Sequence, residues 1–334
     1  MIVTFPVKRP VGAALGQRTG KAMDVTLHIG AHHCATTTFQ NYMRLNGDRL
    51  ATQGVGFWGP RRTRNGLFRG ILPRPTAATG RDLRRRAIGR VQMHLARSDG
   101  LGLASLVVSD ENMMGTPREN LRLGDLYCGV GERMARYDEA FGGRISNVVV
   151  NIRSQDRYWA SALGYSLTRG RGVPGRATLE RLAYGARCWR DVIADVSCAV
   201  PDAQIWVLPF ETYAGRPEAQ LSAVTGIDAP KTHARNWLNA TPHLPELRAL
   251  VDGMAGPPIL PEGDGRWQPF SPPQAAALRE NYADDLMWLA GGAGGIARLM
   301  PVPDKKPRWD NLPVSNTTRG RTNGDEKRRM ARAR

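Results

Sequence analysis

The sequence is poor in cysteine and contains no long apolar run. Its four cysteines form no C-x-x-C pair, and their spacing suggests neither a zinc site nor a disulfide framework. No apolar stretch approaches the roughly 18 residues that a membrane-spanning helix requires. Residues 1–22 also lack the charged segment and apolar core of a signal peptide. We therefore expect a protein of the reducing cytoplasm, without a transmembrane segment and without a bound metal.

Acidic residues are scarce relative to basic ones. The chain has 47 lysines and arginines against 30 aspartates and glutamates, which gives a formal net charge of +17. Such an excess favours anionic partners, among them nucleotide phosphates, acidic glycans and anionic lipid. A genome that favours arginine codons is an equally simple cause of the same excess. No recognition helix, RNP motif or zinc finger is visible, so we do not expect a nucleic-acid partner, whereas peripheral contact with a membrane stays open.

Short apolar segments alternate with helical ones along the middle of the chain. This alternation predicts βαβ units and therefore an α/β fold, a three-layer α/β/α domain with a central parallel sheet of the P-loop NTPase-like kind. We place this domain at residues 23–300, between a flexible N-terminal extension (1–22) and a basic disordered tail (301–334). The expected strands are 25–29, 54–60, 103–108, 145–152 and 204–208. One helix should begin at residue 36, and further helices should span 81–98, 132–141, 155–168, 179–196, 217–225, 244–253 and 272–290. Residues 61–75 should form a loop.

The segment between the first strand and the first helix carries the clearest functional signal. It runs from Gly30 through two histidines to three consecutive threonines that open the helix. Backbone N–H groups and the dipole at a helix N-terminus attract an anion, so the segment predicts a phosphate cradle. A Walker A motif reads G-x-x-x-x-G-K-[ST]. Counted from Gly30, Ala35 stands at the second glycine, Thr36 at the lysine and Thr37 at the hydroxyl position. Without the lysine, we expect a smaller anion than a triphosphate.

Residues 30–38 resemble the 5′-phosphosulfate loop of the sulfotransferases, whose bacterial members read roughly HIGxHKTGTTSLQ. In that family an arginine at the end of a buried strand and a serine eight residues later bind the 3′-phosphate of the cofactor. Arg153 and Ser161 have this spacing here, after the strand 145–152. The resemblance covers residues 24 to about 290 and implies 3′-phosphoadenosine 5′-phosphosulfate (PAPS) as cofactor, with no metal. By position, the family's phosphosulfate-binding residues correspond to Gly30, Ala35, Thr36, Thr37 and Thr38.

The resemblance implies transfer of a sulfuryl group to a hydroxyl or amine of a carbohydrate, lipid or small molecule. The family's loop lysine corresponds to His33, and a neighbouring phosphosulfate would raise the pKa of this histidine and favour its imidazolium form. Glu111, at the carboxyl end of the strand 103–108, is the candidate general base; a helix-capping or solvated carboxylate is the alternative interpretation.

Three other functions remain compatible with the sequence. The replacement of lysine by His33 allows a weakly active or inactive member of the same family. A P-loop nucleotide or sugar kinase is a second alternative, against which the missing Walker lysine counts. The third is a non-catalytic basic protein that binds nucleic acid or an anionic glycan. The acceptor and the oligomeric state are not readable from the sequence.

Overall fold

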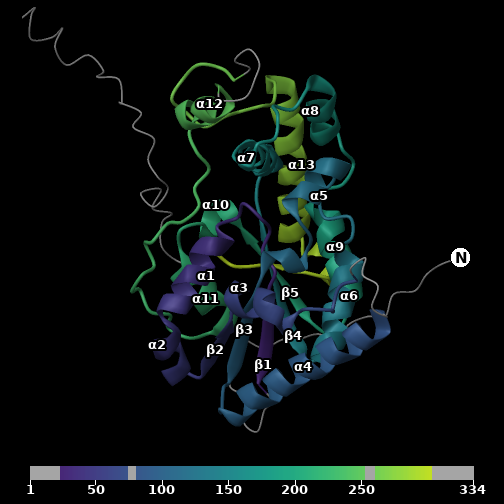
Figure 1. The fold of residues 1–334 in the computed structure, drawn as a ribbon, viewed down its shortest axis with the longest axis vertical. Coiled ribbons are helices and arrows are strands. Elements are labelled where there is room, and N and C mark those ends of the chain that lie inside the picture. The colour runs from purple at the N-terminus through teal and green to yellow at the C-terminus, as the bar shows by residue number, and fades with distance from the viewer. Residues whose placement is uncertain (1–22, 74–79, 253–259, 303–334) are drawn as a thin grey trace, which may run out of the picture.

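A single six-stranded parallel sheet organises the computed structural model, which describes residues 23–73, 80–252 and 260–302 (Figure 1). The strands run in the order β2-β3-β1-β4-β5-β6, so β1 lies between β3 and β4. All the pairings are parallel. The strands are β1 (Asp24–His28), β2 (Val55–Trp58), β3 (Ser105–Ser109), β4 (Ile145–Ile152), β5 (Gln204–Pro209) and β6 (Arg298–Leu299). The predicted α/β class with a parallel sheet is confirmed.

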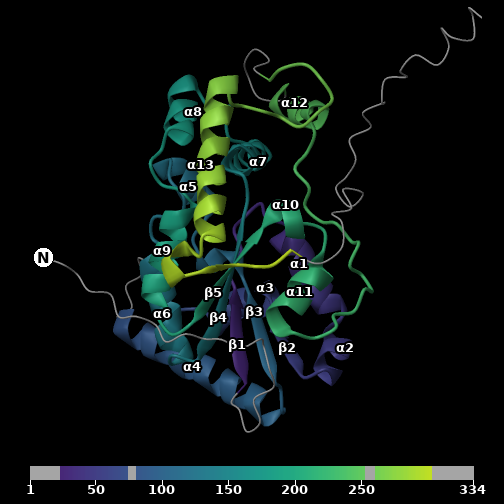
Figure 2. The ribbon, with the colours of Figure 1, turned by 180° about the vertical axis from the view of Figure 1, so that it is seen from behind.

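Helices cover both faces of the sheet, because alternate strand residues point to opposite sides. Val148 and Val150 of β4 belong to the larger hydrophobic cluster, which includes the buried faces of α4, α6 and α9. Val149 instead packs with Tyr213 and Val224 on the opposite face. That face is covered by α1, α2, α10 and α11 (Figures 1 and 2). The covering helices are α1 (Thr36–Leu45), α2 (Gly47–Thr52), α4 (Gly80–Gly100), α6 (Val130–Phe141), α9 (Trp189–Ala199), α10 (Phe210–Tyr213) and α11 (Pro217–Thr225).

A further group of helices stands beyond the carboxyl ends of the strands, at the top of Figure 1. In this group α7 packs against α5, α12 and α13, and α13 runs back down to contact α9 and β6. These helices are α5 (Pro117–Leu123), α7 (Gln155–Leu167), α8 (Arg176–Ala183), α12 (Leu244–Asp252) and α13 (Pro272–Ala290). They form a wall above the carboxyl edge of the sheet, where the predicted functional motifs follow the strands.

The prediction of one helix over 179–196 is wrong. The structure has α8 and α9, separated by residues 184–188. The second helix begins where it does because Cys188 and Asp191 form a capping box. Asp285 of α13 also accepts the backbone N–H groups of Trp189 and Arg190, at 2.9 and 3.2 Å. A cap supplied from a helix almost a hundred residues later leaves no local signal.

The prediction of a continuous loop over 61–75 is also wrong in its first part. Pro60–Arg62 form the short helix α3, and Thr63–Leu67 form a π-helical turn, η1. Asp110 holds the start of η1, because it accepts Thr63 Oγ1 at 2.5 Å and Arg64 Nη2 at 2.7 Å. Not predicted were α5, β6, the break between α1 and α2 and the short 3-10 turn η3 (Ala293–Gly295), whereas the 3-10 turn η2 (Glu111–Met113) begins where the turn at Asp110 and Glu111 was considered. The proposed extension 1–22 and residues 303–334 of the proposed tail lie outside the described residues.

Candidate functional site

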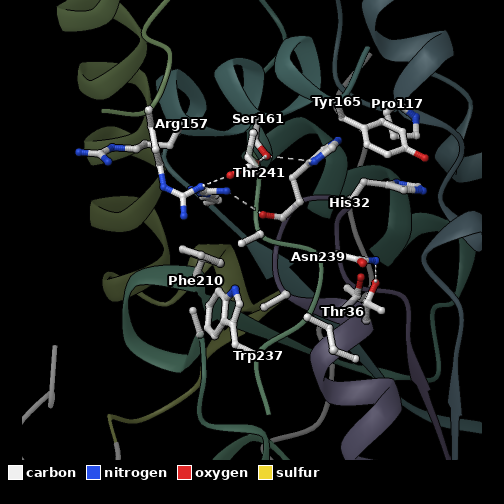
Figure 3. A pocket seen from close by; sticks show the side chains of 18 of the residues that line it. His32, Thr36, Pro117, Arg157, Ser161, Tyr165, Phe210, Trp237, Asn239 and Thr241 are labelled. Carbon is white, nitrogen blue, oxygen red and sulfur yellow. Dashed lines mark hydrogen bonds between the residues drawn. The ribbon is translucent and has the colours of Figure 1, made fainter. Parts of the chain in front are cut away.

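A pocket of about 1150 Å³ lies at the carboxyl edge of the sheet (Figure 3). Its lining comes from the segments that follow β1, β3, β4 and β5, together with residues 237–243 and 265–268. Sites of parallel α/β sheets form at this edge. Seven of the residues singled out in the sequence line the pocket: His33, Ala35, Thr36, Thr37, Glu111, Arg153 and Ser161.

The loop after β1 has an unusual backbone that explains its small residues. Gly30, His33 and Ala35 adopt positive φ angles of 50°, 64° and 60°. A Cβ atom at Gly30 would lie 2.4 Å from Cγ2 of Thr36, so the loop closes on the first turn of α1 only with glycine at this position. Ala35 is the N-cap residue of α1, and its methyl group makes no capping hydrogen bond. The first-turn amides of α1 therefore receive no side-chain cap from this residue.

The three threonines have different roles. Thr36 and Thr37 line the pocket. Thr38 is buried and is not part of the lining, because its Oγ1 accepts the backbone N–H of Leu238 at 3.1 Å. The structure therefore leaves Thr38 outside the lining, and its assignment to the cofactor site stays a prediction. Gly30 likewise shapes the loop without lining the pocket.

Arg153 and Ser161 converge on the same residue of the loop. Nη1 of Arg153 donates to the backbone oxygen of His33 at 2.9 Å, and Oγ of Ser161 lies 3.1 Å from Nδ1 of the His33 ring. The guanidinium of Arg153 also stacks on the Phe210 ring, 4.2 Å from its centroid. The two sequence motifs, 120 residues apart, thus form one continuous wall of the pocket.

The charge of the pocket lining is strongly positive. It includes six arginines and two glutamates: Arg64, Arg153, Arg157, Arg169, Arg216, Arg266, Glu111 and Glu211. Burial lowers the pKa of Arg153, and the neighbouring charges of Arg157 and Arg266 lower it further, against the opposing effect of Glu211. Glu211 is itself engaged, since it accepts the N–H of Ser154 at 3.1 Å and the hydroxyl of Tyr282 at 2.7 Å. The arrangement favours an anionic ligand.

Three nitrogen atoms of the lining residues are buried and have no hydrogen-bond partner among the described residues. They are Nε of Arg153, Nε2 of His33 and Nε1 of Trp237. Buried polar groups without partners are uncommon in folded proteins and cost free energy. Three of them around one pocket indicate a site whose hydrogen bonds are completed by a ligand.

His33 differs from a loop lysine in its charge. Burial lowers its pKa to about 3, and the neighbouring charges of His32 and Arg153 act in the same direction. The imidazole of the structure is therefore neutral at pH 7. An imidazolium at this position would need the charge of a bound anion to restore it, so the cationic role of His33 stays a prediction.

Glu111 lines the pocket in a fixed position. Its Oε2 accepts Gln40 Nε2 at 2.7 Å, and its Oε1 pairs with Arg64 Nη2 at 2.9 Å. Burial alone would raise the pKa of Glu111, but His32, Arg64 and the hydrogen bond from Gln40 together hold it below its ordinary value. The capping role considered for this carboxylate belongs to Asp110, which accepts the N–H of Asn112. Glu111 is thus mostly buried and a weak base.

The segment 237–241 contacts both the threonine loop and Ser161, and it was not predicted as part of the site. Leu238 bonds to Thr38, Asn239 Nδ2 donates to Thr37 Oγ1 at 3.3 Å, and Thr241 Oγ1 lies 2.7 Å from Ser161 Oγ (Figure 3). Four further lining residues were not predicted as part of the site: His32, Arg157, Trp237 and Arg266. The segment has no periodicity, and its partners lie 80 to 202 residues earlier, so only the fold reveals them.

Comparison of the chain with family models, with curated proteins and with solved structures gives no match. Within the described ranges, no group of three or more histidine, cysteine, aspartate or glutamate side chains is arranged to hold a metal ion. Over the same ranges, no helix combines the length and the apolar character that crossing a membrane requires. The geometry and charge of the pocket therefore provide the evidence for its function.

Proposed function

We propose that the protein is a sulfotransferase that moves a sulfuryl group from PAPS to a hydroxyl or amine of a carbohydrate, lipid or small-molecule acceptor. The observation that carries the proposal is the junction at His33, where the threonine loop meets Arg153 and Ser161. The resemblance assigned these two motifs to the two ends of one cofactor. Their meeting in one positively charged pocket is the arrangement that such a cofactor requires.

The residues of the pocket fit a nucleotide that carries two anionic groups. Thr36 and Thr37, at the first turn of α1, would hold the phosphosulfate. Arg153 and Ser161 would hold the 3′-phosphate, with Arg157 and Arg266 adding positive charge nearby. The orphaned Nε of Arg153 is a donor that a phosphate oxygen can satisfy. When bound, PAPS supplies the sulfuryl group and the leaving phosphate.

The remaining work of the pocket is positioning and charge stabilisation, as in other transfers between anionic oxygens. Glu111 is the carboxylate placed to accept the proton of the acceptor, although its lowered pKa makes it a weak base in this structure. Arg64 holds the carboxylate of Glu111 through their ion pair of 2.9 Å. The cytoplasmic location expected from the cysteine spacing belongs to the same proposal.

Calorimetry with 3′-phosphoadenosine 5′-phosphate (PAP) tests the assignment. Arg153→Ala should weaken PAP binding about ten- to a hundredfold, because a charge-assisted hydrogen bond is lost. Adenosine 5′-phosphate lacks the 3′-phosphate, so its weaker binding should change little in the same variant. Arg62→Ala is the matched control: Arg62 also stacks on an aromatic ring, that of Trp58, and bonds to one further group, His94, but it does not line the pocket.

Two results would contradict the proposal. One is the absence of PAP binding by the wild-type protein. The other is an equal loss of PAP and adenosine 5′-phosphate binding in Arg153→Ala, which would place the arginine away from the 3′-phosphate. Turnover of ATP that depends on Mg²⁺ would instead favour the kinase alternative; no lysine is found in the pocket lining of the described chain. PAP binding without transfer to any acceptor would indicate the inactive family member.

A further inference from the structure

His32 lies in the pocket lining between the threonine loop and the end of β3, and its ring is held at both nitrogen atoms. Nδ1 lies 2.9 Å from the hydroxyl of Tyr127, and Nε2 lies 3.2 Å from Oδ1 of Asn112. Figure 3 shows His32 in the same pocket as Thr36 and Asn239. His33, its neighbour in the loop, turns its own Nδ1 to Ser161. His32 is therefore the histidine on the Glu111 side of the pocket.

The hydrogen bonds around Tyr127 determine where the proton of His32 resides. Asn120 Nδ2 donates to the Tyr158 hydroxyl at 2.8 Å, and Tyr158 donates its own proton to Tyr127 at 3.2 Å. The backbone N–H of His32 also donates to the Tyr127 oxygen, at 2.9 Å. Both lone pairs of that oxygen are then occupied, so the only proton of Tyr127 points to Nδ1 of His32. Nδ1 is the acceptor, and the ring proton is on Nε2.

We propose that His32 is the neutral hydrogen-bond donor of the transfer site, with its Nε2–H available to an oxygen of the transferring group or the acceptor, and that Tyr127 is the positioning residue that fixes this tautomer. The inference rests on the proposed function. Asn112 Oδ1 holds the Nε2–H through a long bond of 3.2 Å, which a substrate oxygen can replace. Asn112 lines the pocket as well, so the exchange needs no change in the loop.

The charges around His32 are consistent with a neutral ring. Burial lowers its pKa; Glu111 and Asp110 and the bond to Asn112 raise it, Arg64 lowers it, and the net effect is a pKa below the ordinary value. On the other side of the loop, His33 is also neutral, and the Tyr127 hydroxyl stays protonated because burial raises its pKa. A fixed neutral donor contributes to transfer because its bond strengthens as charge develops on the oxygen that it contacts.

Nitrogen-15 NMR of the histidine-labelled protein tests the tautomer without any substrate. The His32 signals, assigned through His32→Gln, should show a single Nε2–H tautomer at pH 7. In Tyr127→Phe the fixed tautomer should be lost. Tyr42→Phe is the matched control, because its buried hydroxyl bonds to the backbone oxygen of Pro230 outside the pocket. An imidazolium signal or an Nδ1–H tautomer in the wild type at pH 7 would overturn the inference.

Kinetics test the role in transfer, with release of PAP from PAPS and water as the acceptor. His32→Ala should lower kcat about ten- to a hundredfold, the value of one hydrogen bond to a charged group, while the Kd for PAP stays the same. His32→Gln, whose amide N–H can replace the donor, should recover part of this loss. An unchanged kcat in His32→Ala, or an equal loss of PAP affinity, would show a purely structural residue and overturn the role.

The two proposals fail in different ways. If PAP binds and Arg153→Ala weakens it, while the NMR shows the wrong tautomer, only the assignment of His32 is overturned. If the wild type binds no PAP, the proposed sulfotransferase fails, and the role of His32 in transfer is overturned with it.

Discussion

Substitution of Gly30 by alanine should disrupt the cradle through a steric conflict that the structure locates at one atom. The added Cβ would lie 2.4 Å from Cγ2 of Thr36, and the backbone at Gly30 has a φ of 50°. A left-handed backbone costs an alanine roughly 1–2 kcal/mol. Overpacking a buried methyl group adds about 1–3 kcal/mol. The free energy of unfolding should therefore fall by about 2–5 kcal/mol, the sum of the two effects.

Two further variants separate these contributions. Gly170 has a φ of 76°, and a Cβ there would meet nothing within 4 Å, so Gly170→Ala measures the backbone strain alone. Thr36→Ser removes the Cγ2 atom and should itself cost about 1 kcal/mol for the lost buried methyl group. In the double variant Gly30→Ala/Thr36→Ser, the conflict is gone, so the double-mutant cycle should give a favourable interaction of about 1–3 kcal/mol.

Urea denaturation of the four variants, with PAP calorimetry on each folded protein, measures both consequences. Gly30→Ala should lose nucleotide affinity because the first turn of α1 must shift, whereas Gly170→Ala should keep it. The reasoning is refuted if Gly30→Ala is no more destabilising than Gly170→Ala, or if Thr36→Ser brings no recovery. Either result would mean that the loop relaxes around a Cβ atom and does not need glycine for close approach.

Three other predictions follow from single residues. Acidification from pH 7.5 to 5 should lower the unfolding free energy by roughly 2 kcal/mol through His28, because burial lowers its pKa to about 4 and the unfolded state, with a pKa of 6.5, takes up the proton first. Urea denaturation of the wild type and His28→Asn at both pH values should show a smaller loss in the variant. Asp285→Ala should cost about 1–3 kcal/mol in the same assay, because the buried N–H groups at the start of α9 lose their acceptor; an unchanged unfolding midpoint would contradict this. Thr37→Val should weaken PAP binding about tenfold, because one hydrogen bond to an anion is lost. Thr38→Val should destabilise the protein with little effect on PAP affinity, because the Thr38 hydroxyl holds Leu238. Equal effects of the two variants on PAP affinity would contradict these different roles.

The position of the two predicted motifs at one edge of the sheet follows from where the strands end. Arg153 comes directly after the apolar strand β4, and Gly30 comes one residue later than that after β1. Parallel strands bring their carboxyl ends to one edge of the sheet. The spacing of Arg153 and Ser161 depends only on the start of α7, which the periodicity locates well. Local pattern and one topological rule were therefore sufficient to bring the two motifs into the same pocket.

The parts that the sequence did not predict depend on contacts between distant segments. Thr38 has the same local pattern as Thr36 and Thr37, and only the position of Leu238 turns it away from the pocket. The charge of His33 depends on its burial beside Arg153 and Ser161, which lowers its pKa. This burial cannot be predicted from the ordinary pKa of histidine. Tyr127, in the loop between α5 and α6, bonds to His32 and to Tyr158 of α7, and neither tyrosine belongs to a sequence motif.

The strong positive charge of the chain is better understood from where its arginines lie than from their number. Several surface arginines pair with neighbouring carboxylates, as Arg136 does with Glu132 and Arg176 with Glu180, and exposed pairs of this kind contribute little. Arg153 and Arg266 are different, because burial lowers the pKa of each and no ion pair joins either one to a carboxylate in the described part of the chain. An arginine stays ionised even so, and the folded protein carries the cost of desolvating it. The proposed anionic ligand would offset that cost. A codon bias toward arginine would add charge to the surface, but it would not explain why these two guanidinium groups share one pocket with the threonine loop.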